Sequence, residues 1–447
     1  MTPTSRSPLI LLAGAAAIVL AASLSVPRAE ADDWPQWRGP SRDGKSAETG
    51  LLQEWPDQGP RLEWKIKGLG AGYSSLSVAD GRIFTMGDLG SSQYVIALSE
   101  ASGQILWRAR IGERWADRYG GPRATPTVDG DHIYAMGTEG DVVCLEAATG
   151  IELWRRNLQE DFGGTLMRAG GEYDWRYAES PLVDEDRVVV TPGGPEAIMV
   201  ALDKANGEEI WRVAIPSLGE GGLDGAGYSS VVVSHGAGVK QYVQLVGRGV
   251  IGVEAETGRF LWGYNRVAND VANIPTPLVD GDYVFASSGY GQGSALLELV
   301  ADGDGVRAEE VYFLEGEVMQ NHHGGLILHQ GSVYTGTGHN KGFPLSVRFA
   351  DGEVFWGPIR NDGGSSAAVS YADERLYFRY QDGMVILVEA SPEGYHEHGS
   401  FRIPDIANFS WSHPVIAGGK LYLREQDSLL CYDITAPAES DEAAAGP

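Results

Sequence analysis

Polar and aromatic side chains stand immediately before several short apolar runs of this chain. Imidazole, guanidinium, carboxylate and amide groups bind ligands through hydrogen bonds and ion pairs, and aromatic rings stack on them. If the fold gathers these segments on one face, they form a binding pocket. The residues concerned are Tyr119, Arg123, Trp175, Arg176, Glu179, Tyr228, Asn273, Asn321, His322, His323, Trp411 and His413.

Each of these side chains also has a purely structural explanation. A polar residue beside a buried strand often only pairs with backbone groups or with water. Arg176 and Glu179 could form a structural ion pair with each other. His322 and His323 are adjacent, so on a strand they point to opposite faces and do not chelate one ion. We therefore predict no metal site and assign no catalytic residue.

Motifs of common enzyme chemistries are absent from the sequence. It has no Gly-x-Ser-x-Gly nucleophile elbow, no His-Glu-x-x-His zinc motif, no phosphate-binding loop and no Cys-x-x-Cys-His haem motif. The formal net charge is −27 at pH 7, and no basic stripe interrupts it. Such a surface repels phosphate backbones and anionic lipid headgroups, so we expect no nucleic acid partner and no membrane-surface binding.

The elements that must position the candidate residues come from one recurring unit. It opens with a small residue, often Pro, and an apolar pair, then has an Asp-Gly-like turn, two β-rich runs, and a turn with Gly before Trp. The clearest copy runs from Thr125 to Trp154. Openings lie near residues 75, 125, 180, 229, 276, 325, 367 and 413, at the roughly 40–50-residue spacing of four-stranded propeller blades. The closing aromatic residues are Trp64, Trp107, Trp154, Trp211, Trp262 and Trp356, with Tyr312 and Tyr395 in two degenerate copies.

The two ends of the repeat array are complementary. The last unit stops near residues 431–434 without a closing strand, whereas residues 62–66 form a closing strand with no unit before them. We predict an all-β, eight-bladed β-propeller of four-stranded blades over residues 62–435, its ring closed by an N-terminal strand that completes the last blade. The segments before the innermost strands then surround one mouth of the channel, and the candidate residues lie there. Cys144 and Cys431 occupy equivalent places in different blades, so we expect two buried free thiols.

Three segments carry a family resemblance: residues 97–107 (ALSEASGQILW), 201–211 (ALDKANGEEIW) and 252–262 (GVEAETGRFLW). They resemble the tryptophan-docking motif of propellers of the pyrroloquinoline quinone (PQQ) type. That group includes the quinoprotein dehydrogenases and the non-enzymatic BamB-like proteins. The resemblance covers about residues 62–435 and implies that the closing tryptophans stack between neighbouring blades. The front segment, residues 34–44, is similar to the start of exported bacterial PQQ-like repeat proteins.

The cofactor-binding residues of the quinoprotein dehydrogenases can be compared with this sequence. Quinoprotein dehydrogenases carry two adjacent cysteines beside the PQQ, and this chain has no adjacent pair. Their calcium-binding Glu and Asn and their catalytic Asp lie in motifs that match no stretch here. We therefore expect no cofactor, and PQQ with calcium stays the alternative.

The terminal segments have separate roles. Arg6, the apolar run 9–24 and Ala29-Glu30-Ala31 indicate a signal peptide over residues 1–31, cleaved near Ala31; the alternative is an uncleaved anchor helix. Residues 32–61 read as a strap packed on the blades, the alternative being a docking element that presents Trp34 and Trp37. Residues 436–447 read as a disordered acidic tail. The mature chain is then periplasmic or otherwise exported, without a membrane span.

These observations favour a non-catalytic exported propeller that binds an unknown envelope protein or a small ligand through its channel-mouth face. The alternatives are a PQQ- and calcium-dependent oxidoreductase, or another pocket-based activity on carbohydrate.

Overall fold

The computed structural model describes residues 1, 33–406 and 409–437. The expected signal peptide and most of the expected acidic tail lie outside the described residues. Within those ranges, no helix combines the length and the apolar character that crossing a membrane requires.

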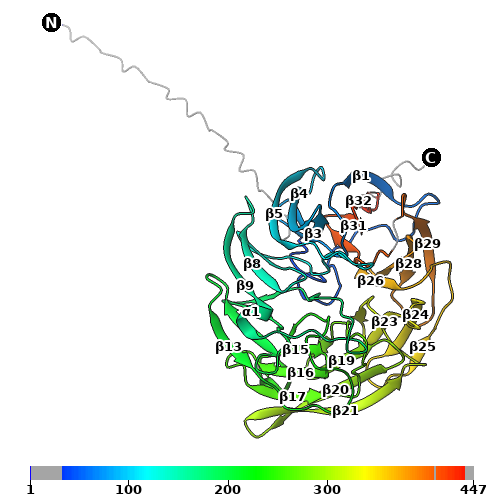
Figure 1. The fold of residues 1–447 in the computed structure, drawn as a ribbon. Helices are drawn as coiled ribbons and strands as arrows, with labels where there is room; N and C mark the ends of the chain where they lie inside the picture. The colour runs from blue at the N-terminus through cyan, green and yellow to red at the C-terminus, as the bar shows by residue number, and fades with distance from the viewer. Residues whose placement is uncertain (2–32, 407–408, 438–447) are drawn as a thin grey trace. The chain divides into compact units, whose positions relative to one another are not determined.

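The described chain forms eight four-stranded antiparallel sheets arranged as a β-propeller, which confirms the predicted fold (Figure 1). Blades 1 to 4 consist of β2 (Ser77–Ala79), β3 (Arg82–Leu89), β4 (Ser92–Ser99) and β5 (Ile105–Glu113); β6 (Thr127–Asp129), β7 (His132–Met136), β8 (Asp141–Glu146) and β9 (Glu152–Asn157); β10 (Leu182–Asp184), β11 (Arg187–Val190), β12 (Met199–Asp203) and β13 (Glu209–Val213); and β14 (Val232–Ser234), β15 (Gln241–Val246), β16 (Gly249–Glu254) and β17 (Phe260–Tyr264).

Blades 5 to 8 consist of β18 (Leu278–Asp280), β19 (Tyr283–Ser288), β20 (Gly293–Asp302) and β21 (Gly305–Glu315); β22 (Leu326–His329), β23 (Ser332–Thr337), β24 (Phe343–Arg348) and β25 (Val354–Trp356); β26 (Ala367–Ala372), β27 (Arg375–Tyr380), β28 (Met384–Glu389) and β29 (Glu397–Arg402); and β30 (Val415–Ala417), β31 (Lys420–Glu425), β32 (Ser428–Asp433) and β1 (Arg61–Lys67). Short helical turns, α1 (Leu158–Phe162) and η2 (Gly236–Gly238), interrupt the blades.

The ring closes between the two ends of the array. β1 pairs antiparallel with β32, with Arg61 opposite Asp433 and Lys67 opposite Ser428. Figure 1 shows β1 in blue beside β32 in red. The last blade therefore contains strands from both ends of the described chain, as the sequence predicted.

Closing aromatic residues join neighbouring blades. The indole N–H of Trp107 on β5 donates to the carbonyl of Ala147 in blade 2 at 3.2 Å, and that of Trp154 on β9 donates to Lys204 in blade 3 at 2.9 Å. Gly150 lies against the ring of Trp107, where an added Cβ would come within 2.6 Å of it. In blade 5 the hydroxyl of Tyr312 makes the equivalent bond, to Phe349 of blade 6 at 2.8 Å. These rings fill the wedges between blades.

Blade 7 has no Trp or Tyr on its outer strand, β29, to make this bond to the next blade. Tyr395, expected to close that blade, lies before β29 and packs instead against Trp356 of blade 6, with ring centroids 5.7 Å apart. Trp55, from the segment that precedes β1, packs edge-on against Phe401 and Tyr377 of blade 7 and is buried. A tryptophan from the N-terminal segment thus stands where the repeat has lost its own.

The two cysteines are buried free thiols, as expected. Cys144 pairs across β7 and β8 with Tyr134, and Cys431 pairs across β31 and β32 with Tyr422. The repeat places both sulfurs at the same position of different blades.

Candidate functional site

The described residues that precede β1, residues 33–60, are called the N-terminal segment here, and they cross the middle of the ring. Trp34 exchanges two backbone hydrogen bonds of 2.8 Å with Val78 of β2 in blade 1. The guanidinium of Arg42 donates to the carbonyls of Ser180 (2.7 Å) and Pro181 (3.0 Å), just before β10 in blade 3. Further contacts reach the inner strands of other blades, through Val128, Thr276, Leu326 and Tyr371.

Two arginines anchor this segment inside the propeller. Arg38 donates to the carbonyls of Leu326 and Asp43 and is 3% exposed. Burial lowers the pKa of Arg38 to about 10 and that of Arg42 to about 9, partly offset by Asp43 and Glu179 respectively. Both side chains remain cations at neutral pH, and each donates to two backbone carbonyl oxygens. The segment is therefore an internal part of the propeller.

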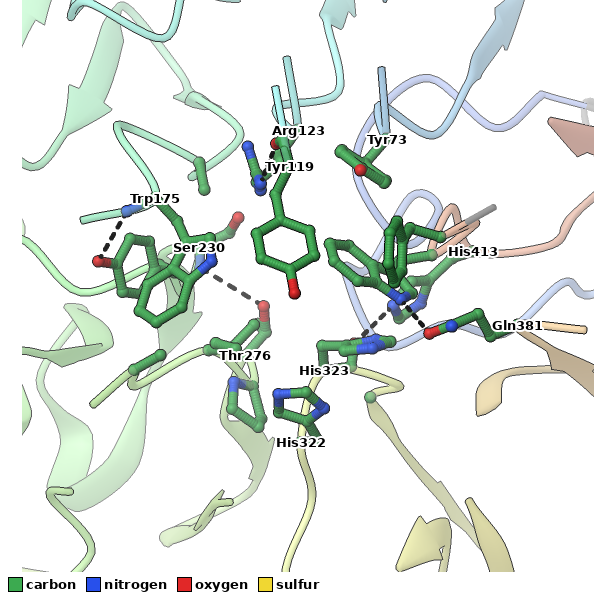
Figure 2. A pocket seen from close by; sticks show the side chains of 18 of the residues that line it. Tyr73, Tyr119, Arg123, Trp175, Ser230, Thr276, His322, His323, Gln381 and His413 are labelled. Atoms are coloured by element: carbon green, nitrogen blue, oxygen red, sulfur yellow. Dashed lines mark hydrogen bonds between the residues drawn. The ribbon is translucent and has the colours of Figure 1, made fainter. Parts of the chain in front are cut away.

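A cavity of about 390 Å³ lies at the channel mouth above this segment (Figure 2). Its volume falls in the range of small-molecule sites. Eight of the twelve residues expected at the rim line it: Tyr119, Arg123, Trp175, Tyr228, His322, His323, Trp411 and His413.

Aromatic rings form much of the cavity wall. Tyr73 and Trp411 stack with ring centroids 4.5 Å apart and an interplanar angle of 19°. The indole N–H of Trp411 donates to Gln381 at 2.6 Å, which fixes the ring. Trp175 packs edge-on against Tyr228 in another part of the wall, with ring centroids 5.8 Å apart. In Figure 2 the ring of Tyr119 reaches between these groups, with its hydroxyl toward the cavity centre.

Four histidines line the same cavity. The sequence argument that His322 and His323 point to opposite faces is wrong, because both precede β22 in a bend and both reach the cavity. Their ring centroids are 4.7 Å apart, and His339 lies 4.4 Å from His322. The nitrogens of His322 contact Tyr290 (3.1 Å) and the hydroxyl of Ser366 (3.2 Å). Over the described ranges, no group of three or more His, Cys, Asp or Glu is arranged to hold a metal ion.

The protonation of these histidines follows from burial. Burial lowers the pKa of His323 to about 3, helped by repulsion from His413 and His339. It lowers the pKa of His413 to about 3 as well, helped by Arg38. Arg38 can only donate, so Nδ1 of His413, at 3.4 Å, accepts, and its Nε2–H donates to the backbone carbonyl of His323 at 3.0 Å. At neutral pH these rings are uncharged.

His323 differs from the other three. Both of its ring nitrogens are buried, yet neither has a hydrogen-bond partner among the described residues. A buried polar atom without a partner costs about 1–3 kcal/mol, and in native proteins it often marks a functional position. His323 is one of the residues of the cavity wall, and its two nitrogens are covered from solvent there.

Arg123 brings a positive charge to this wall. Its guanidinium lies over the rings of Tyr73 (5.0 Å) and Trp115 (4.8 Å) and donates to the carbonyls of Tyr119 (2.7 Å) and Gly121 (3.1 Å). Burial lowers its pKa to about 10, so it remains charged at neutral pH. In the described part of the chain, no carboxylate forms an ion pair with Arg123 and none lines the cavity, although Asp117 acts on Arg123 through space and partly offsets the lowered pKa.

Four predicted rim residues lie outside the cavity. Glu179 is buried and accepts from the backbone N–H of Thr191 and from Gln244. Asn273 donates to Val246 and Gly247, while Asn321 donates to Thr335 and Gly325. All three satisfy groups around the inner strands.

The expected pairing of Arg176 with Glu179 is also wrong. Arg176 pairs with Glu139 (3.4 Å) and Asp174 (3.7 Å) on the outer side, because Glu179 is turned toward Arg42 in the channel. Arg176 belongs to the surface.

Sequence reasoning missed several residues of the wall. Trp37 contributes a ring 4.6 Å from His413 and donates to Thr276 at 3.1 Å, and Arg38 lies beside it. Both come from the N-terminal segment, which carries no repeat signal. Tyr73 and Tyr290 are part of the wall too, and Tyr73 precedes an inner strand, so the rule that selected Tyr119 could have found it.

Comparison with known proteins places the chain in a family. Residues 91–357, more than half of the chain, match the family described as outer membrane protein assembly factor BamB. Relatives of that description occur in Moranella endobia (24% identity, covering 56% of this chain and 57% of the relative) and in Xanthomonas campestris pv. campestris (28%, covering 25% of each). The matched part therefore spans little more than half of the first relative and a quarter of the second.

Solved structures show the same fold at low identity. BamB from Moraxella catarrhalis is similar with a TM-score of 0.57 and 14% identity, covering 85% of this chain and 99% of that one. Quinohemoprotein alcohol dehydrogenase from Comamonas testosteroni has a TM-score of 0.60 and 13% identity, covering 94% and 83%. Together with the match over residues 91–357, the repeat and the eight blades show that this chain belongs to the BamB family of PQQ-like β-propellers.

Proposed function

We propose that this chain is an exported, non-catalytic propeller that binds a small ligand, or a segment of an envelope protein, in the cavity at its channel mouth. The unpartnered nitrogens of His323 carry this proposal, because they are buried polar groups in the wall of a cavity of ligand size. The N-terminal segment supplies Trp37 and Arg38 to that wall, so this cavity is a built feature.

The residues present favour binding over catalysis. Among the described residues, the serine hydroxyl that contacts an imidazole is that of Ser366, 3.2 Å from His322, but Ser366 is buried and is not part of the cavity wall. The second nitrogen of His322 faces the hydroxyl of Tyr290, where a hydrolytic triad has a carboxylate. Described carboxylates are absent from the wall, so it offers no carboxylate to orient an imidazole or to act as a paired acid and base.

Calcium-bound PQQ does not fit these residues. Ca²⁺ takes six to eight oxygen ligands, with carboxylates prominent among them. The described wall of the cavity provides imidazoles, guanidinium groups, aromatic rings, hydroxyls and the amides of Asn340 and Gln381, but no carboxylate. The chain also has only two cysteines, Cys144 and Cys431, which are not adjacent in the sequence. We therefore derive no redox step.

The descriptions of the relatives support a location in the cell envelope and an envelope protein as the partner. Both curated relatives are described as outer membrane protein assembly factors. An envelope location agrees with the expected signal peptide, and an envelope protein is the partner that this description favours.

The test compares the full chain with Trp411→Ala, which removes one cavity wall, and with Ile151→Ala, which changes an exposed residue just before β9. Thermal unfolding is measured against a library of small molecules and envelope-derived peptides. At a concentration of 100 times Kd, a ligand stabilises by about 2.7 kcal/mol. We expect a compound that stabilises the parent and Ile151→Ala but not Trp411→Ala.

Two results contradict the proposal. If every stabilising compound acts equally on all three proteins, the cavity is not the site. Saturable turnover of a dye-linked oxidation assay with added PQQ and calcium shows an enzyme instead.

A further inference from the structure

We infer that the ligand of the cavity is an acidic sugar, a hydroxyl-bearing ring with a carboxylate group. This inference rests on the proposed function and names the ligand class of the same site. It combines the free nitrogens of His323, the aromatic walls, and the unpaired guanidinium of Arg123.

The state of His323 calls for hydroxyl groups. A neutral imidazole presents one N–H donor and one lone-pair acceptor, and both nitrogens of His323 are free. A carboxylate only accepts and an ammonium only donates, so neither can satisfy both nitrogens. A hydroxyl group does both, and neighbouring hydroxyls on one ring can serve the two edges. Nδ1 of His339, on the same wall, is unpartnered as well.

The wall aromatics fit the faces of a sugar ring. Sugar rings present C–H groups on their faces and hydroxyls at their edges, and aromatic rings pack against such faces while their polar handles stay bonded. Trp411 and Trp175 are partly buried and held by a hydrogen bond to Gln381 and an edge contact with Tyr228. The cavity of about 390 Å³ lies at the small end of ligand sites, which suits one ring or the end of a longer glycan.

Arg123 selects an acidic ring over a neutral one. It is a partly buried cation without a described carboxylate partner, and a carboxylate forms strong, often bidentate hydrogen bonds with a guanidinium. The overall charge of −27 opposes anions at long range. At an ionic strength of 0.15 M the screening length is about 8 Å, so distant surface acids weigh less than the guanidinium at the wall.

Three other ligand types fit less well. A cationic ligand finds no described carboxylate in this wall. An aromatic acid without hydroxyls leaves the nitrogens of His323 unsatisfied. A purely apolar ligand leaves the nitrogens of His323 without partners and the charge of Arg123 without a counter-ion.

The experiment measures Kd for five probes with the full chain: galacturonate, digalacturonate, galactose, galactosamine and benzoate. Galactose and galacturonate differ only at C6, so their affinity ratio reports the carboxylate. We expect the two uronates to bind most tightly, galactose at least about tenfold more weakly, as one charge-assisted hydrogen bond predicts, and galactosamine and benzoate not measurably.

Two variants test the assigned residues. His323→Phe keeps a ring but removes both nitrogens, and we expect about a tenfold to hundredfold loss of affinity for every sugar. His132→Phe makes the same change at an exposed histidine of β7 and should bind like the parent. Arg123→Gln should reduce the ratio between galacturonate and galactose toward one, a readout that a general loss of fold does not produce.

The inference is wrong if benzoate or galactosamine binds as tightly as galacturonate, if galactose matches galacturonate, or if none of the five probes binds. In the last case, a compound from the thermal screen that depends on Trp411 still supports the proposed function. If no compound depends on Trp411 either, both proposals fail.

Discussion

Burial sets the protonation of single residues around the channel more strongly than charge pairing does. Burial raises the pKa of Glu179 to about 7, although Thr191, Gln244 and the cation of Arg42 all favour its charged form. Glu179 has an ordinary pKa of 4.5. The folded protein therefore holds this proton more tightly than the unfolded chain does.

A stability profile in pH follows from this shift. Between about pH 4.5 and pH 7 the folded state binds more protons at Glu179 than the unfolded state, so this residue's contribution to the free energy of unfolding falls as pH rises. The full fall is about 3.5 kcal/mol, because each pKa unit between 4.5 and 7 corresponds to about 1.4 kcal/mol. Glu179→Gln should remove it, and urea titrations at pH 4, 6 and 8 measure the difference.

The control is Glu160→Gln, on the exposed side of α1. It should leave the pH profile of the parent unchanged. A profile of Glu179→Gln that runs parallel to the parent from pH 4 to pH 8 would contradict the burial argument.

The sequence could predict which loops reach the channel mouth, because that depends on where a residue lies relative to the inner strands. The rule that loops before inner strands reach the channel mouth found Tyr119 and His323. It could not distinguish a side chain facing the cavity from one serving the backbone, as Asn273 and Asn321 do. That choice depends on side-chain rotation and on neighbouring blades, which a single sequence does not display.

At the scale of elements, the contacts between blades depend on the closing tryptophans. Trp154 of β9 is 8% exposed and donates to Lys204 in blade 3. Trp154→Ala should lower the free energy of unfolding by about 3–5 kcal/mol, because it leaves a cavity between blades 2 and 3. Leu153→Ala, one residue earlier and 49% exposed, should change it by no more than about 0.5 kcal/mol. Denaturant unfolding measures both, and equal losses would show that burial between blades is not the cause.

The N-terminal segment depends on its buried arginine. Arg42→Met keeps the length of the side chain but removes the donors to Ser180 and Pro181. Each hydrogen bond from a charged group contributes about 1.5–3 kcal/mol, so we expect the segment to leave the channel more often. Chymotrypsin should then cut after Trp37, whereas Pro35 protects the bond after Trp34, and the blades stay intact.

Arg259→Met serves as the control, because Arg259 forms exposed ion pairs with Glu254 and Asp304 at the outer part of the blades. Mass spectrometry of the early fragments measures the cutting. Equal cutting of both variants would show that the bonds of Arg42 do not hold the segment.

The blades could be read from the sequence because each one repeats the same local pattern of turns and apolar runs. The path of residues 34–55 could not, since its contacts to Val78, Tyr371 and Phe401 join positions far apart in the chain. No repeat marks Trp55, although it stands in for the closing aromatic residue of blade 7. Long-range contacts of a single copy leave no periodic signal.

At the scale of the whole molecule, stability depends on the joint between the two ends of the propeller. Blade 8 draws β1 from the front of the described chain and β30 to β32 from its end. If β1 separates from β32, the ring opens and two strand edges become unpaired, which favours aggregation. Unfolding should therefore start at this joint rather than between two consecutive blades.

A disulfide across the joint tests this directly. Lys67 and Ser428 are opposite one another on β1 and β32, and paired antiparallel residues have Cα atoms about 4.5–5.5 Å apart, within the range that a disulfide needs. In the double variant Lys67→Cys/Ser428→Cys, the bond closes a loop containing most of the chain, so stabilisation should reach about 5 kcal/mol. Calorimetry of the oxidised and reduced forms compares identical sequences. The rate of unfolding in denaturant then locates the first opening: it should fall in the oxidised form if unfolding starts at β1, whereas equal unfolding rates would mean that the ring opens elsewhere.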